Sequence, residues 1–133
     1  MKICVAGAYG AFGLKHLDAL NNIEEIEVTS VMGPNKAKIE SLAEERNIPN
    51  ARTTLEESIS EDKPDAVILA TPTQAHAEQA IVCMNAGKHV LIEIPMADSL
   101  EDSHLVVDKQ KETGLTCMAG HVRRFNPSHQ CKL

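Results

Sequence analysis

The sequence predicts an α/β protein built on a doubly wound, mostly parallel sheet of about six strands. Two observations predict this class: short apolar runs alternate with segments of helical periodicity, and several of the runs are apolar on both faces. Such runs are typical of parallel strands that helices cover on either side of the sheet. A length of 133 residues suffices for one core, so we expect one domain over 1–133.

Five short apolar runs are predicted as strands, and a weaker sixth strand is expected near 51–54. Segments with helical patterns lie between the runs, as the crossovers of a parallel sheet require. In chain order, the five runs are 2–6 (KICVA), 26–32 (IEVTSVM), 66–70 (AVILA), 89–93 (HVLIE) and 115–119 (LTCMA).

Five segments between these runs carry helical periodicity, and several have recognisable ends. Asn35, directly after a proline, suits a helix start, and Ser99 followed by Asp102 resembles a capping box with Asp in place of Glu. Gly87 and Gly114 stand where a helix C-terminus favours a left-handed residue. The predicted helices are 11–21, 35–47, 55–61, 74–86 and 99–113.

Composition excludes several classes of function. A net charge of −6 with scattered Lys and Arg gives no basic patch, so nucleic acid is not an expected partner. No apolar run approaches the ~18 residues of a membrane span, and the short run at 3–8 is no signal peptide, so we expect no membrane and a cytoplasmic location. Cys4, Cys83, Cys117 and Cys131 show no C-x-x-C spacing, which predicts reduced thiols and no metal site.

Three glycines between the first strand and the first helix form the pattern G-x-x-G-x-x-G, at Gly7, Gly10 and Gly13. Amides at a helix start can hold a pyrophosphate, and the missing Cβ at Gly10 lets the phosphates approach the backbone. The usual fingerprint is one residue shorter, and Tyr9 is the additional residue. The alternative is a tight strand-to-helix turn without a ligand. The predicted cofactor loop consists of Gly7, Tyr9, Gly10, Ala11, Phe12 and Gly13.

The end of the second strand bears on the choice of cofactor. An NAD site typically has Asp or Glu about 20 residues beyond the loop, to bind the ribose 2′-hydroxyl. Here that count reaches Gly33, and residues 30–36 hold no carboxylate. The sequence therefore favours NADP, with NAD possible, and Asn35 and Lys36 are candidates for the 2′-phosphate. Lys36 is equally well explained as a solvated helix residue.

Three further segments follow strands at the edge where open α/β sheets bind ligands: TPTQAH at 71–76, EIP at 93–95 and GHVRRFNP at 120–127. With the longer stretches TPTQAHAEQAIVCMNAGKHV, EIPMADS and GHVRRFNPSHQ, the chain resembles the Gfo/Idh/MocA oxidoreductases. In that family the amino-terminal half is a nicotinamide-binding Rossmann domain. The resemblance covers essentially the whole chain, strongest from residue 66 and weakest at 33–60.

The resemblance implies roles for the first two of these segments. Thr71, Pro72 and Thr73 match a turn that runs along the cofactor between the pyrophosphate and the nicotinamide ribose. His76 matches the histidine of that motif, although a capping or packing role explains it equally well. Glu93 matches a glutamate that accepts hydrogen bonds from ribose hydroxyls, and Ile94 and Pro95 complete its motif.

For the third segment, GHVRRFNP at 120–127, the resemblance implies a place beside the nicotinamide and the substrate. His121 corresponds to a position beside the nicotinamide and is the candidate catalytic residue of this chain. Arg124 and Arg123 could bind a carboxylated small-molecule substrate, because a guanidinium matches a carboxylate with two parallel donors. Arg123 has the alternative of being a surface residue.

Two departures from the family pattern stand out. Ile94 replaces the lysine of the usual E-K-P motif, so that general acid/base is absent, although one subgroup of the family shares E-I-P. Lys88 precedes the strand and is expected at the opposite edge of the sheet. Members also carry a second domain with catalytic histidines, substrate contacts and a dimer interface, so we expect a cofactor-binding half of a homo-oligomeric dehydrogenase.

Two alternatives stay open beside a dehydrogenase of this family. The chain could be a stand-alone nucleotide-binding or sensing module without catalysis. It could also be a different Rossmann dehydrogenase with the longer glycine loop, such as aspartate dehydrogenase or dihydrodipicolinate reductase. The EIP and GHVRRFNP segments weigh against that second alternative.

Overall fold

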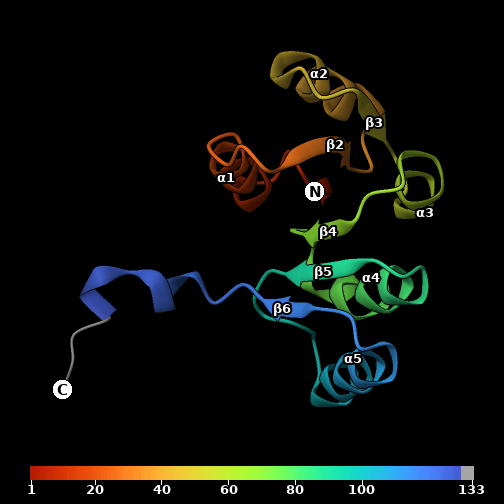
Figure 1. Ribbon diagram of the computed structural model, residues 1–133, viewed down its shortest axis with the longest axis vertical. Helices are drawn as coiled ribbons and strands as arrows, with labels where there is room; N and C mark the ends of the chain where they lie inside the picture. The colour runs from red at the N-terminus through yellow and green to blue at the C-terminus, as the bar shows by residue number, and fades with distance from the viewer. Residues whose placement is uncertain (130–133) are drawn as a thin grey trace.

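A six-stranded parallel sheet in the order β3-β2-β1-β4-β5-β6 forms the centre of the protein (Figure 1). The computed structural model describes residues 1–129. This order confirms the predicted doubly wound Rossmann fold, and the register confirms that each pairing is parallel. The strands are β1 Lys2–Ala6, β2 Glu27–Met32, β3 Asn50–Arg52, β4 Ala66–Leu69, β5 His89–Ile92 and β6 Cys117–Ala119.

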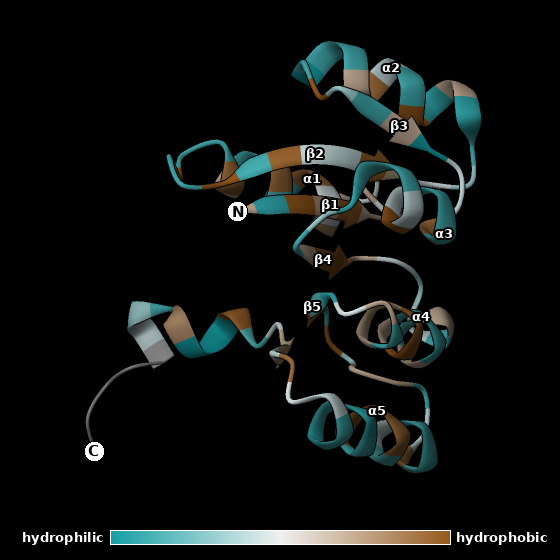
Figure 2. Ribbon diagram, turned by 45° about the vertical axis from the view of Figure 1, so that its right-hand side comes forward, coloured by the Kyte–Doolittle hydropathy of each residue, from teal (hydrophilic) through white to brown (hydrophobic). Residues whose placement is uncertain are grey.

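The helices lie on both sides of the sheet, and α3, α4 and α5 share one side (Figures 1 and 2). Five helices were predicted, and each has a counterpart in the structure. None of the helices within residues 1–129 is both long and apolar enough to cross a membrane. The helices are α1 Ala11–Leu20, α2 Lys36–Arg46, α3 Leu55–Glu57, α4 Thr73–Asn85 and α5 Leu100–Thr113.

The prediction of one helix over 55–61 is wrong, because the segment divides into the short α3 and a π-helical turn, η1 Ser58–Asp62. A single π turn preserves the direction of a helix while changing its hydrogen-bond spacing, and residue periodicity over seven positions does not distinguish the two. Two 3-10 turns, η2 Val122–Phe125 and η3 Pro127–His129, were not predicted. Their few residues carry no helical repeat.

Capping follows the sequence signals with one correction. The side chain of Asn35 accepts a hydrogen bond from the Lys38 amide, and Gly87 and Gly114 have φ values of 74° and 68°, as predicted. At α5, Ser99 accepts from the Asp102 amide, but the Asp102 carboxylate accepts from the Ser99 hydroxyl. Asp is one methylene shorter than Glu, so the bond to the backbone that completes a capping box is not made.

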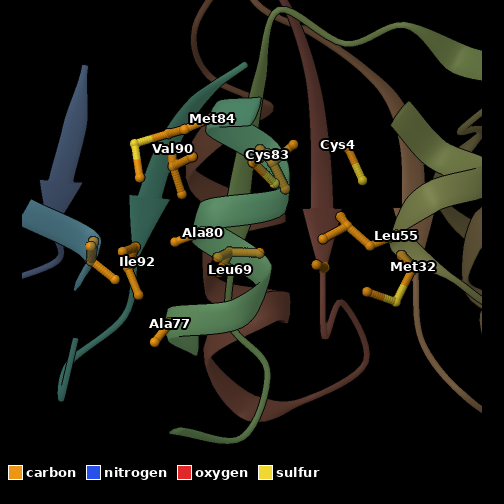
Figure 3. Packing of buried hydrophobic residues seen from close by; sticks show 13 residues of the cluster. Cys4, Met32, Leu55, Leu69, Ala77, Ala80, Cys83, Met84, Val90 and Ile92 are labelled. Carbon is orange, nitrogen blue, oxygen red and sulfur yellow. The ribbon is translucent and has the colours of Figure 1, made fainter. Parts of the chain in front are cut away.

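The core has two layers because successive residues of a strand point to opposite faces of the sheet. On β1, Ile3 and Val5 pack against α1 and α2, whereas Cys4 and Ala6 face the side of α3, α4 and α5. Figure 3 shows this second layer, in which one face of α4 packs on the central strands. Its largest residues include Met32, Leu55, Leu69, Met84, Ile92 and Val106.

One part of the sheet has less cover. On the side of α1, a groove of about 470 Å³ runs across β4, β5 and β6 and is lined mainly by apolar side chains. Met118, on the edge strand, is 47% exposed in this groove, and Met1 is 57% exposed at its other end.

Candidate functional site

The glycine loop follows β1 at the point where the strand order reverses, between β1 and β4. Gly7 has φ +73°, and a Cβ there would lie 2.3 Å from the carbonyl oxygen of Ala70. A Cβ on Gly13 would lie 2.3 Å from the Gly7 oxygen, so Gly13 lets α1 pack on the turn. At Gly10 the Gly7 oxygen, at 3.2 Å, is the one atom within 4 Å of an added Cβ. Apart from this one tight contact with backbone, the space in front of Gly10 is open.

The starts of α1 and α4 border this loop, and neither has a side-chain cap. The N-cap of α1 is Gly10 and that of α4 is Pro72, and neither forms a side-chain hydrogen bond. By contrast, Asn35, Thr54 and Ser99 cap the helices that follow them. The first amides of a helix have no partner within it, and they need a cap, water or a ligand. The two uncapped starts fit an anionic group at this edge.

The additional residue of the loop, Tyr9, reaches across to the start of α2. A Cβ on Gly33 would lie 2.4 Å from Cε1 of the Tyr9 ring, and the Asn35 amide donates a 3.3 Å hydrogen bond to the Tyr9 hydroxyl. The Lys38 ammonium lies 5.8 Å from the ring centroid. The loop and the β2–α2 turn are thus joined where the sequence predicts the 2′-phosphate.

The side chains predicted for that phosphate have partners within the chain. Asn35 caps α2, and the exposed ammonium of Lys36 lies 3.9 Å from Glu40. A pair this long between exposed groups holds the Lys36 side chain weakly. A role of either residue in cofactor binding stays a prediction.

His76 joins two of the predicted cofactor segments. Its ring is 2% exposed, with Nδ1 2.8 Å from the carbonyl oxygen of Pro95 and Nε2 2.8 Å from that of Thr71. A neutral imidazole donates to one of the two carbonyls at a time, and an imidazolium donates to both. His76 therefore ties the turn before α4 to the turn after β5, which supports the packing role. The Ile94–Pro95 peptide in that second turn is cis.

Glu93 lies directly after β5 and is 5% exposed. Its Oε1 lies 2.6 Å from Nε2 of His16, a residue of α1 that sequence reasoning did not select. A Cβ on Gly120 would lie 3.3 Å from the same oxygen. The Glu93 carboxylate is thus the point where the carboxyl ends of β5 and β6 meet the first turns of α1. The sequence signal for His16 is its position three residues after Gly13, on the face of α1 that Gly13 turns to the sheet.

A hollow of about 360 Å³ lies at the same edge, between the β2–α2 turn, the start of α3 and the turn before α4. At its wall the Thr71 hydroxyl donates a 2.6 Å hydrogen bond to Oε1 of Gln79. Sequence reasoning did not select Gln79. The lining residues of the hollow include Met32, Pro34, Thr53, Thr71, Pro72 and Gln79.

The residues predicted for the substrate side lie apart from these turns. His121 and Arg124 line a hollow of about 370 Å³ with Met118, Ala119 and Phe125, and Arg123 is not among its lining residues. Each of the three predicted residues is exposed. Figure 1 shows this segment running away from the sheet after β6. The end of the quoted stretch GHVRRFNPSHQ, at residue 130, lies outside the described residues.

The cysteines of the described residues are free thiols. Cys4 and Cys83 are buried, and burial raises the pKa of Cys83 to about 12. Cys117 is half-buried, and the predicted free thiol of Cys131 lies outside the described residues. Within residues 1–129, no group of three or more His, Cys, Asp or Glu side chains could hold a metal ion.

Comparison with known proteins identifies the family of the chain. The model of the Gfo/Idh/MocA family, described as an oxidoreductase family with an NAD-binding Rossmann fold, matches residues 1–121. The chain belongs to this family. The Gfo/Idh/MocA assignment agrees with the strand order and with the glycine loop at the switch point.

Two curated relatives and one solved structure illustrate the likeness. The chain is 55% identical over 130 residues to 4-carboxy-2-hydroxymuconate-6-semialdehyde dehydrogenase of Sphingobium sp. strain SYK-6, covering 98% of this chain and 41% of that protein. It is 32% identical over 127 residues to scyllo-inositol 2-dehydrogenase (NAD(+)) of Bacillus subtilis, covering 95% of this chain and 37% of that protein. The crystal structure of the WlbA dehydrogenase from Bordetella pertussis, in complex with NADH and UDP-GlcNAcA, superposes with a TM-score of 0.89 at 25% identity, over 95% of this chain and 36% of that one. The chain thus spans about two fifths of the length of these relatives.

Proposed function

We propose that this chain binds NADP along the carboxyl edge of its sheet, as the cofactor-binding part of a dehydrogenase. The observation that carries the proposal is the open space before Gly10, bordered by the uncapped starts of α1 and α4 at the switch point of the sheet. Doubly wound folds bind nucleotides at this point, with the phosphates on helix amides. Membership of an NAD-binding oxidoreductase family supports a nicotinamide dinucleotide at this point.

Three of the predicted segments have a task in this proposal. The amides from Gly10 to Gly13 would hold the pyrophosphate, while Thr71 to Thr73 would follow the cofactor towards the nicotinamide. Glu93 would accept hydrogen bonds from ribose hydroxyls. The hollow beside Pro34 and Pro72 would receive the adenosine end.

NADP in preference to NAD is proposed from what the β2–α2 turn lacks. No carboxylate occurs from Ser30 to Lys36, so nothing there would repel a 2′-phosphate or bind a free 2′-hydroxyl as an acid does. Relatives are named for both cofactors, since one scyllo-inositol 2-dehydrogenase of Bacillus subtilis is named for NAD(+) and another for NADP(+). The proposed preference for NADP over NAD therefore rests on the residues of the β2–α2 turn and not on the relatives.

The proposed reaction follows the relative from Sphingobium. We propose 4-carboxy-2-hydroxymuconate-6-semialdehyde as substrate, and the resemblance implies oxidation of its cyclic hemiacetal to 2-pyrone-4,6-dicarboxylate in aromatic-acid catabolism. The cofactor supplies the hydride acceptor in such a reaction. Arg124 and Arg123 would bind substrate carboxylates, and His121 would lie beside the reacting carbon.

Proton transfer is not assigned to the turn after β5, because Ile94 has no ionisable group. The proposal further places the protein in the cytoplasm as a homo-oligomer.

Titration calorimetry with NADP and NAD tests the proposal. We expect NADP to bind at least ~10-fold more tightly, because a 2′-phosphate adds charge-assisted hydrogen bonds worth about 1.5–3 kcal/mol each. Tighter binding of NAD would contradict the proposed preference. Binding of neither cofactor would contradict the proposed function itself.

A further inference from the structure

We infer that His16 is a positioning residue for Glu93: it fixes one carboxylate oxygen and leaves the other to a ribose hydroxyl of the nicotinamide half. The inference rests on the proposed cofactor site. It concerns a residue of α1 that would itself not touch the cofactor.

The two side chains meet across the sheet edge from distant parts of the sequence. His16 Nε2 lies 2.6 Å from Glu93 Oε1, and 77 positions separate the residues in the chain. Their side chains are only 17% and 7% exposed. A buried carboxylate without a partner is costly, and this contact supplies one. Because a carboxylate accepts hydrogen bonds, Nε2 must carry the hydrogen.

Oε1 is also confined from a second direction. A Cβ on Gly120 would lie 3.3 Å from Oε1 and 3.4 Å from the carboxyl carbon of Glu93, so the chain after β6 runs close against the carboxylate. Within residues 1–129 the one hydrogen bond of the Glu93 side chain is made by Oε1, and Oε2 is not among the buried atoms that lack a partner. Oε2 therefore reaches the accessible surface at the carboxyl edge.

This arrangement prepares Glu93 for a ligand. A carboxylate that one hydrogen bond already holds loses less side-chain freedom when its second oxygen binds a hydroxyl. Because His16 lies on the helix that begins at the glycine loop, the bond also sets Glu93 relative to that loop. The pyrophosphate end and the ribose end of the site are thereby held at one spacing.

The test compares His16→Leu with His16→Gln. Leu removes the donor at similar volume, whereas the Gln amide nitrogen can take the place of Nε2. Calorimetric titrations would use NADPH and 2′,5′-ADP, which lacks the reduced nicotinamide riboside and the phosphate that joins it to the adenosine half. We expect His16→Leu to weaken NADPH binding by about tenfold, the loss of one hydrogen bond to a charged group. Binding of 2′,5′-ADP should stay within about twofold of wild type, and His16→Gln should recover most of the NADPH affinity.

The outcomes separate this inference from the proposed function. Equal NADPH affinity of His16→Leu and wild type would overturn the inference, as would an equal loss for NADPH and 2′,5′-ADP or a failure of Gln to rescue. Wild type that binds neither ligand would overturn the proposed function and the inference with it. Should His16→Leu not fold, His16→Asn gives the same comparison, because its shorter amide reaches Glu93 less well than Gln.

Discussion

The three glycines of the loop have different physical roles, and substitutions can separate them. We expect Gly10→Val to abolish NADP binding while the protein stays folded, because an added side chain would project into the open space before the loop. Gly13→Val should instead unfold the protein or destabilise it strongly, since its Cβ would lie 2.3 Å from backbone. Calorimetry measures the binding, and circular dichroism on heating measures the stability.

Gly87→Ala is a matched control for these variants. Gly87 lies after α4 with φ +74° and with nothing within 4 Å of an added Cβ. It should lower stability by about 1 kcal/mol through backbone strain and leave cofactor affinity unchanged. Retained affinity in Gly10→Val would show that the loop is a structural turn and no phosphate site.

The buried thiol of Cys83 predicts chemical inertness. Burial raises its pKa to about 12, so its thiolate is scarce at pH 8, and the thiolate is the reactive form. We expect Cys83 to resist alkylation in the native protein and to react rapidly in denaturant, as measured by mass spectrometry of the labelled peptides. Rapid native labelling of Cys83 would mean that α4 does not pack as described.

The same pKa predicts the direction of a stability change. In the unfolded chain the thiol ionises near its ordinary pKa of about 8.5. The folded state keeps its proton up to about pH 12. The unfolded state then binds fewer protons, so stability falls as the pH rises between these values. Cys83→Ala should make denaturant midpoints less sensitive to pH in that range.

Between elements, Arg52 of β3 forms ion pairs with two carboxylates of the π-helical turn, Glu61 at 2.7 Å and the more buried Asp62. Arg52 donates two hydrogen bonds to Asp62, at 3.0 and 2.6 Å, and the Asp62 side chain is 2% exposed. We expect Arg52→Met to lower the free energy of unfolding by about 2 kcal/mol, because it leaves a buried carboxylate unpaired. Arg46→Met is the control, since its partner Asp18 is 62% exposed and the loss should be small. Equal losses of unfolding free energy for the two variants in urea denaturation would show that the buried pair stabilises the protein no more than the exposed one.

The elements themselves were largely predictable from the sequence. The six strands and five helices follow from local features, namely apolar period, caps such as Asn35 and terminal glycines such as Gly114. The division of 55–61 was not predictable, because α and π turns differ by hydrogen-bond spacing and not by residue pattern.

In the candidate site, the placement of the turns at strand ends was predictable from the sequence, whereas the contacts between elements were not. The turns after β1, β4 and β5 do lie at one edge, as parallel strands require. The pair His16 and Glu93 and the contact of Tyr9 with Gly33 join residues far apart in the sequence. Periodicity carries no information about such pairs.

For the whole molecule, the groove across β4, β5 and β6 predicts self-association. Its lining includes the exposed Met118 and half-buried Leu91, and apolar surface of this kind favours contact with a second copy of the chain. Sedimentation should show dimers or larger species, and Met118→Lys should shift them towards monomer. A monomer at high concentration would contradict the prediction.

In the proposed function, catalysis needs groups that this chain does not supply. We expect the 133 residues alone not to reduce NADP with 4-carboxy-2-hydroxymuconate-6-semialdehyde, because Ile94 has no ionisable group to act from the position of the family's lysine. A chimera of this chain with the remainder of the Sphingobium relative should show turnover. Absorbance of the reduced nicotinamide measures both. Turnover by the chain alone would place the base within it, and His121 would then be the first residue to substitute.

The position of the bound cofactor decides whether the carboxyl edge of the sheet is the nucleotide site. Amide chemical shifts of labelled protein, followed by NMR during addition of NADPH, report which backbone groups the ligand affects. We predict the largest changes at residues 7–13, 71–76 and 93–95, which meet at the carboxyl edge of the sheet. Changes confined to the groove across β4, β5 and β6, or to the opposite edge near Lys88, would contradict a cofactor site at the carboxyl edge.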